Sequence, residues 1–155
     1  KENKFYIEPE KLLTYNGGLY VIFYVRNQKE FWLLAVHRIL NLKVYDEVFP
    51  DDHPFDERDF VKYRFGLFSG SLEKIRLKFD KSIRHYIEHK HWNSSQEFKS
   101  DKKGNLILEM ETPITPELTA WILGWNKNVK VLKPNKLTND IKDLIISMKK
   151  QYKMK

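Results

Sequence analysis

Three histidines are placed where they could bind a metal ion. His85, His89 and His91 lie in the segment HYIEHKH, and two imidazoles four residues apart on a helix can share one metal. On a helical projection Ile83 and Ile87 form the apolar stripe, and His85 and His89 fall on the opposite, water-facing side. No Asp or Glu lies on that side within one turn to complete a ligand set. We therefore predict a solvated helix face, with no bound metal and no other cofactor.

A second candidate for chemistry is the cationic pair His37-Arg38, which closes an aromatic-rich stretch, GGLYVIFYVRNQKEFWLLAVHRI, at positions 17–39. In a strand, alternate side chains share a face, and this alternation places Arg38 on the face of Trp32. In the preceding strand, Tyr20 and Tyr24 share the less apolar face. A guanidinium is suited to phosphate or carboxylate, and tyrosines offer stacking surfaces for bases.

Two interpretations of Arg38 are open at this point. Together with His37, Tyr20 and Tyr24 it could contact a negatively charged ligand. Alternatively, it could form a structural ion pair with a nearby acid such as Asp46 or Glu47.

Enzymatic chemistry finds no support in the sequence. The chain has no cysteine, which excludes a thiolate nucleophile, a cysteine-ligated zinc and a disulfide scaffold. It also contains no glycine-rich phosphate loop, no serine in a nucleophile elbow and no paired carboxylates in a plausible cleft segment. We therefore predict a binding module and not an enzyme.

The net charge of +7 is unevenly distributed along the 155 residues. Residues 1–70 hold 10 Lys/Arg and 11 Asp/Glu, whereas residues 71–155 hold 18 Lys/Arg and 10 Asp/Glu. The basic half could mark contact with nucleic acid or another polyanion, or it could be an ordinary solvated lysine-rich surface. No apolar run approaches the length of a membrane span, so we expect a soluble protein.

The apolar pattern predicts two domains joined by a connector. Residues 1–50 contain β-rich segments at 4–8, 19–26, 31–39 and 42–49, punctuated by turn residues. Residues 51–71 are rich in acids, prolines and glycines, and we interpret them as a connector with one short helix near 57–64.

Residues 72–155 predict a second domain of mixed structure. Strands are expected at 75–79, 95–100, 106–110 and 129–132. One helix is expected from an Asp80 cap to about Lys90, a second from a Thr115 cap to Gly124, and a third after Pro134. The last helix carries one apolar stripe, formed by Leu137, Ile141, Leu144, Ile145, Met148 and Tyr152. This βαββαβα order favours helices packed on one face of an antiparallel sheet.

At this point the sequence resembles the WYL-domain family of bacterial transcription regulators. The first half shows Pro9-x-x-Leu12, then Gly18-Leu19-Tyr20-Val21, then His37-Arg38-Ile39, then Phe49, with Leu19-Tyr20-Val21 standing where the family has Trp-Tyr-Leu. The second half is similar to the C-terminal extension of these regulators, called WCX. The motifs that carry this similarity are IRLKFD at 75–80, HWNSSQ at 91–96, Gly104, LTAWILGW at 118–125 and VKVLKP at 129–134.

The resemblance implies an α+β chain with a small Sm/SH3-like β-barrel at 1–50, the first strand of which we expect to lie largely before residue 1, and a ferredoxin-like βαββαβα domain at 72–155. It implies an effector-sensing and dimerising module in the cytoplasm. Its expected ligand is negatively charged, a nucleotide or single-stranded nucleic acid, bound through residues that include Arg38. Promoter DNA would be contacted only by a winged helix-turn-helix upstream of this chain.

Two alternatives to ligand sensing stay open. The module could serve dimerisation alone, without a ligand. It could also be a direct RNA-binding protein, because its C-terminal half is basic and small barrels commonly bind single strands.

Overall fold

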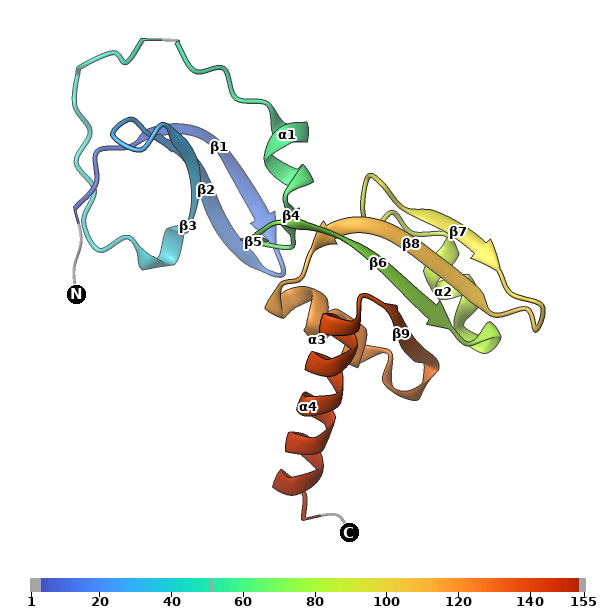
Figure 1. Ribbon diagram of the computed structural model, residues 1–155. Coiled ribbons are helices and arrows are strands. Elements are labelled where there is room, and N and C mark those ends of the chain that lie inside the picture. The colour runs from blue at the N-terminus through green and yellow to red at the C-terminus, as the bar shows by residue number, and fades with distance from the viewer. Residues whose placement is uncertain (1–3, 51, 154–155) are drawn as a thin grey trace. The chain divides into compact units, whose positions relative to one another are not determined.

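The computed structural model describes residues 4–50 and 52–153, and it contains both helices and antiparallel sheets (Figure 1). The chain divides into two compact units, one up to Phe60 and one from Val61 onward. The division falls inside the segment 51–71 that the sequence predicts as a connector. In the described part of the chain, none of the helices has the length and apolar character needed to cross a bilayer.

The first unit contains a three-stranded antiparallel meander in the order β1-β2-β3. Its strands are β1 (Glu8–Tyr15), β2 (Gly18–Val25) and β3 (Glu30–Ala35). Asn16 and Gly17 connect the first two strands with φ of 45° and 77°. Two consecutive positive φ angles belong to the tight hairpin turn that Asn-Gly favours, because its twist matches that of the strands.

The core face of this meander follows the alternation in the sequence. Val21, Phe23 and Val25 are buried in one cluster, against which Trp32 and Leu34 pack. The same alternation places Leu19 on this face, but Leu19 is 42% exposed because it lies next to the hairpin turn at the start of β2.

The strand boundaries expected in residues 1–50 are partly wrong. The strand expected at 4–8 does not form, because residues 4–7 have no regular structure, and β1 runs instead over Glu8–Tyr15, where no strand was expected. The strand expected over 31–39 ends at Ala35, followed by a 3-10 turn, η1 (Val36–Arg38). The strand expected over 42–49 does not form, and Val44 and Val48 are 82% and 94% exposed. An apolar alternating segment becomes a strand only where a neighbouring edge takes its backbone hydrogen bonds, and the described residues provide no such pairing here.

The connector contains the short helix that the sequence predicts near 57–64, namely α1 (Glu57–Lys62). It also contains a two-stranded hairpin that the sequence analysis missed, made of β4 (Arg64–Phe65) and β5 (Phe68–Ser69). Strands of two residues carry too short a pattern to be recognised.

The second unit is built on a four-stranded antiparallel sheet in the order β7-β8-β6-β9. Its strands are β6 (Leu72–Phe79), β7 (Glu97–Ser100), β8 (Leu106–Pro113) and β9 (Val129–Lys133). With the helices α2 (Arg84–Glu88), α3 (Pro116–Gly124) and α4 (Asn135–Gln151), the order of elements agrees with the predicted βαββαβα.

Both predicted helix caps are present. The Asp80 carboxylate accepts a hydrogen bond from the backbone N–H of Ser82 (2.9 Å), and a 3-10 turn, η2 (Lys81–Ile83), leads into α2. The Thr115 hydroxyl accepts from the backbone N–H of Leu118 at the start of α3. The helix expected to reach Lys90 ends at Glu88.

All three helices contribute to one apolar cluster with the sheet. Ile87, Leu118, Ile122 and Leu137 supply the helical side of this cluster, and each is at most 1% exposed. Trp121 and Trp125 meet the Phe79 ring edge-to-face, and Trp92 packs against both of these tryptophans. The helices therefore share one face of the sheet, as the element order predicted.

We predict that Thr115→Ala lowers the free energy of unfolding by about 0.5–2 kcal/mol, the usual cost of losing a hydroxyl cap. Thr115 is 3% exposed, and its hydroxyl lies 3.1 Å from the Leu118 nitrogen and 3.3 Å from the Phe65 carbonyl oxygen, to which it can donate. Urea denaturation would measure the change.

Thr119→Ala is the matched control. Its hydroxyl donates to the Thr115 carbonyl within the helix (3.1 Å), and alanine has the better helix propensity. Equal losses of unfolding free energy in the two variants would show that the capping hydroxyl of Thr115 contributes no more to stability than the hydroxyl of a threonine inside the helix.

Candidate ligand site

The residues predicted to contact a ligand lie at two separate ends of β2. Tyr20 pairs with Ala35 across the β2–β3 ladder, whereas Tyr24 pairs with Phe31. Four residues along a strand span about 13 Å. The tyrosines share a face, as the alternation predicts, but Tyr20 lies at the end of the ladder where β3 leads into η1, and Tyr24 lies near the opposite end.

Arg38 and His37 are both exposed in η1, directly after β3. The prediction that Arg38 shares a strand face with Trp32 is therefore wrong. The strand β3 ends at Ala35, and the cationic pair lies in the 3-10 turn that follows. Among the described residues, Arg38 takes part in no hydrogen bond or ion pair, and neither Asp46 nor Glu47 contacts it. Its charge is available to solvent.

Tyr20 is positioned by the glycine two residues before it. A Cβ at Gly18 would lie 2.8 Å from Tyr20 Cε2 and 2.9 Å from its hydroxyl oxygen. The ring therefore lies against the Gly18 backbone, in space that any side chain at position 18 would occupy. Gly18 holds the phenol half-buried at the Ala35 end of the ladder.

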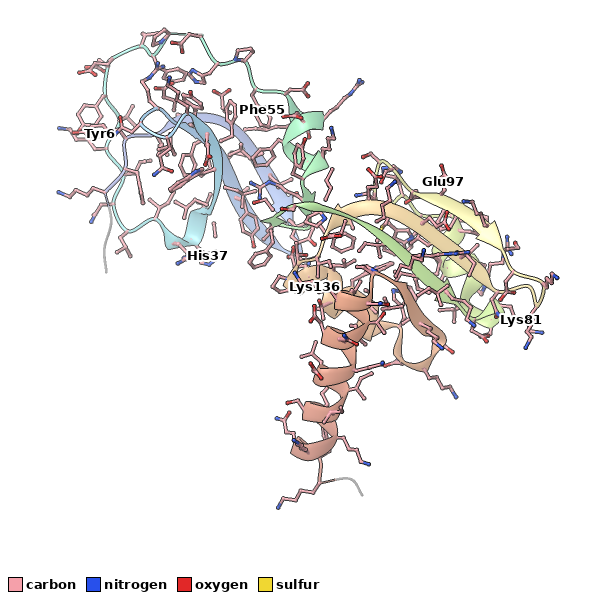
Figure 2. The ribbon with its side chains drawn as sticks, in the orientation of Figure 1. Tyr6, His37, Phe55, Lys81, Glu97 and Lys136 are labelled. Atoms are coloured by element: carbon pink, nitrogen blue, oxygen red, sulfur yellow. The ribbon has the colours of Figure 1, made fainter. Side chains whose placement is uncertain are left out.

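Tyr24 belongs to a different cluster, which the sequence analysis missed. The imidazole of His53 stacks on the Tyr24 ring with centroids 3.8 Å apart and planes 12° apart. Phe31 lies 5.1 Å from Tyr24, and Phe55 lies 5.1 Å from Phe31. Figure 2 shows Phe55 well separated from His37 within this unit. Tyr24 and Arg38 are therefore not parts of one compact site.

The guanidinium beside Tyr24 is that of Arg26, 6.0 Å from the ring centroid. Arg26 donates to both carboxylate oxygens of Glu8 (2.7 and 3.0 Å) and to both of Asp52 (3.2 and 3.3 Å). Hydrogen bonds from Arg26, and then from His53, lower the pKa of Asp52 from its ordinary value of 3.8 to about 2. The hydrogen bonds to Glu8, and then to Asp52, raise the pKa of Arg26. Two carboxylates thus neutralise this cation.

His53 is held between carboxylates on both sides of its ring. Its Nε2 lies 3.0 Å from Glu8 and its Nδ1 lies 2.7 Å from Asp52, and the side chain is 9% exposed. An imidazolium can donate to both acids, whereas a neutral ring can donate to only one. The contacts tie the segment after Pro50 to β1 and β2. The signal in the sequence was a histidine among acids in DDHPFD, but its partner Glu8 is 45 positions away.

The two ends of β2 therefore differ in electrostatics. At one end, Arg26 is engaged with acids, and Tyr24 is covered by His53. At the other end, Arg38 and His37 are exposed. Tyr20, which is half-buried, lies at this end of the β2–β3 ladder. The geometry favours Arg38, His37 and Tyr20 as one group of ligand contacts and separates Tyr24 from them. The assignment of all four as ligand contacts stays a prediction.

The histidines of the second unit lie on exposed positions of α2 and the residues after it. His85 contacts the ring of Tyr86 at 3.9 Å, and His89 Nε2 lies 3.8 Å from Glu88. Across residues 4–50 and 52–153, no group of three or more His, Asp and Glu side chains has the geometry of a metal site.

A family model of the WCX domain matches residues 71–148, which is half of the chain. The chain belongs to the WCX domain family, and the resemblance drawn from the motifs between residues 75 and 134 is confirmed. A search of curated proteins found no match. Among solved structures, the chain is similar to proteasome accessory factor B/C (PafBC) of Arthrobacter aurescens, at 19% identity and a TM-score of 0.37. That similarity covers 87% of this chain and 21% of PafBC, so the chain spans about a fifth of the length of that protein.

We predict that Asp52→Asn removes a pH-dependent part of the stability. Because the pKa of Asp52 is lowered on folding, its stabilisation is present above about pH 4 and is lost as the pH falls toward 2. The melting temperature of the variant should lie below that of the wild type near neutral pH, and the difference should vanish near pH 2. Thermal denaturation from neutral to acidic pH would measure this.

Asp46→Asn is the control, because the exposed Asp46 makes no ion pair among the described residues. A difference in melting temperature between the wild type and Asp52→Asn that stays constant down to pH 2 would contradict the prediction.

Proposed function

We propose that the chain is the effector-sensing and dimerising module of a bacterial transcription regulator, and that it has no enzymatic activity. Membership of the WCX family supports this proposal, because the resemblance described above gives WCX as the C-terminal extension of WYL regulators. The first unit would be the WYL barrel and the second the ferredoxin-like domain. The sheet order β7-β8-β6-β9, with helices on one face, supports the ferredoxin-like assignment. The β1-β2-β3 meander supports a barrel assignment.

The single observation that carries the sensing role is the exposed, unpaired Arg38 beside His37. A guanidinium without an acidic partner keeps its five donors for a ligand, and its planar fork fits phosphate or carboxylate oxygens. We propose a nucleotide or a single-stranded nucleic acid as the effector, with the ring of Tyr20 as a stacking surface at this end of β2. Promoter DNA would be contacted by another domain of the full-length regulator.

The dimerising role is supported by apolar surface in the second unit. Only Leu137 of the stripe on α4 is buried, whereas Ile145, Met148 and Tyr152 are 52%, 47% and 72% exposed. Leu123 of α3 and Ile141 and Ile145 of α4 line a groove of about 230 Å³. Figure 1 shows the C-terminal half of α4 extending away from the sheet. We propose that a second copy covers this groove and stripe, since closed twofold contacts are the usual form of homo-oligomers.

We predict that Arg38→Ala lowers affinity for an anionic effector about tenfold to a hundredfold, because hydrogen bonds to charged groups contribute about 1.5–3 kcal/mol. The melting temperature should stay nearly unchanged, since Arg38 is exposed and unpaired. Titration with short single-stranded DNA, short RNA and cyclic dinucleotides, at low and moderate salt, would measure the affinity.

Arg58→Ala removes the same charge from an exposed position of α1 and is the control. If no probe binds the wild type in a saturable manner, the module serves dimerisation without a ligand. If Arg38→Ala mainly lowers the melting temperature, Arg38 is a structural residue.

We also predict that Ile145→Lys converts a homodimer into a monomer, because it places a charge in the groove that the second copy covers. Ser147→Lys, at an exposed polar position of the same helix, should leave the dimer intact. Sedimentation across a wide range of protein concentration would measure the assembly. A wild-type chain that stays monomeric at every concentration would refute dimerisation through this surface.

A further inference from the structure

The sheet of the second unit has one face that no helix covers, because α2, α3 and α4 pack on the other (Figure 1). The register identifies the residues of this open face, which alternate with those of the core face and include the buried Ile107 between Lys78 and Lys99. Its charged members are the cations Lys74, Arg76, Lys78, Lys99, Lys130 and Lys133 and the acids Glu97, Glu109 and Glu111. The face therefore carries twice as many cations as carboxylates.

Two pairs of cations lie directly opposite each other across the β6–β9 ladder. Lys78 pairs with Lys130, and Arg76 pairs with Lys133 after a bulge. Like charges directly opposite each other on one face of a sheet destabilise it. Nothing in the folding of this domain requires the arrangement, since a neutral polar residue at position 130 would fill the same exposed position without repulsion.

The carboxylates of the face pair with only three of its six cations. Glu109 pairs with Arg76 (3.0 Å) and with Lys99, and Glu111 lies 3.6 Å from Lys74. Lys78, Lys130 and Lys133 form no ion pair with any described residue, and Asp101 and Glu109 act on Lys78 and Lys133 only at longer range. The uncompensated charge is thus concentrated where β6 and β9 meet.

The chemistry of this surface decides between classes of partner. The cores of protein interfaces are depleted in lysine and enriched in aromatic residues, and none of the residues that the register places on this face is aromatic. A membrane surface would require exposed apolar anchors beside the cations, which the same set lacks. Lysines and an arginine spread over two adjacent strands suit a linear polyanion, whose phosphates are contacted mainly by such side chains.

We propose that the open face of the β7-β8-β6-β9 sheet binds the phosphate backbone of a nucleic-acid strand through Arg76, Lys78, Lys130 and Lys133. Without aromatic side chains to stack on bases, this surface binds independently of sequence. It lies in a different compact unit from Arg38 and does not depend on the effector site proposed there.

The test compares two double variants that remove the same charge. Lys78→Gln/Lys130→Gln removes two cations from the open face, and Lys149→Gln/Lys150→Gln removes two from the exposed end of α4. Fluorescence anisotropy with labelled oligo(dT) and random-sequence duplex DNA is measured across a salt series. The sheet variant should weaken oligo(dT) binding and lower the slope of log affinity against log salt by about 1.4, since each phosphate contact on a single strand contributes about 0.7.

The sheet variant should also keep or raise the melting temperature, because it removes a repulsive pair. The α4 variant should bind DNA as the wild type does. Equal loss in both variants would show that net charge alone attracts DNA, and unchanged binding in the sheet variant would overturn the proposal outright.

If poly-glutamate binds the wild type as tightly as DNA does, the partner is an acidic protein. Because oligo(dT) is also a candidate effector at Arg38, the two double variants are compared again in the Arg38→Ala background. The sheet variant should still lose oligo(dT) binding there, and a loss seen only with Arg38 intact would overturn the proposal.

Discussion

The burial of one face of β6 is the constraint on which the second unit depends. Ile75, Leu77 and Phe79 are at most 1% exposed and lie between β8 and β9, beneath all three helices. Because successive side chains of a strand point to opposite faces, fixing these three in the core fixes Arg76 and Lys78 on the open face. The apolar core and the basic surface of this domain are therefore two consequences of one strand register, and a slip by one residue would exchange them.

In the first unit, polar contacts play a larger part in fixing the chain. The buried cluster of β2 is small, whereas Arg26, Glu8, Asp52 and His53 connect the start of β1, the end of β2 and the segment after Pro50. Each of these four groups reaches a partner distant in sequence. Such a cluster specifies where a segment without regular structure must lie, provided that its carboxylates stay ionised.

The two units consequently offer different surfaces to anions. In the first, Arg26 beside Tyr24 is engaged with acids, whereas the exposed Arg38 forms no ion pair with a described residue. In the second, the cations of the open face outnumber the acids, and one acid, Glu109, pairs with both Arg76 and Lys99. The available cationic groups are therefore localised in the first unit and extended over a sheet face in the second.

The sequence by itself determined the element order of the second unit, both helix caps and the β2 core face, because each depends on local periodicity or on a side chain within three residues of its partner. It also determined WCX membership, through motifs spread along one domain. Only the tertiary structure decided that β3 ends before His37 and Arg38, that residues 42–49 form no strand, and that His53 stacks on Tyr24. Each of these features depends on a partner that is distant in sequence, either the edge of another strand or another side chain. Apolar alternation along the chain does not show which partner is available.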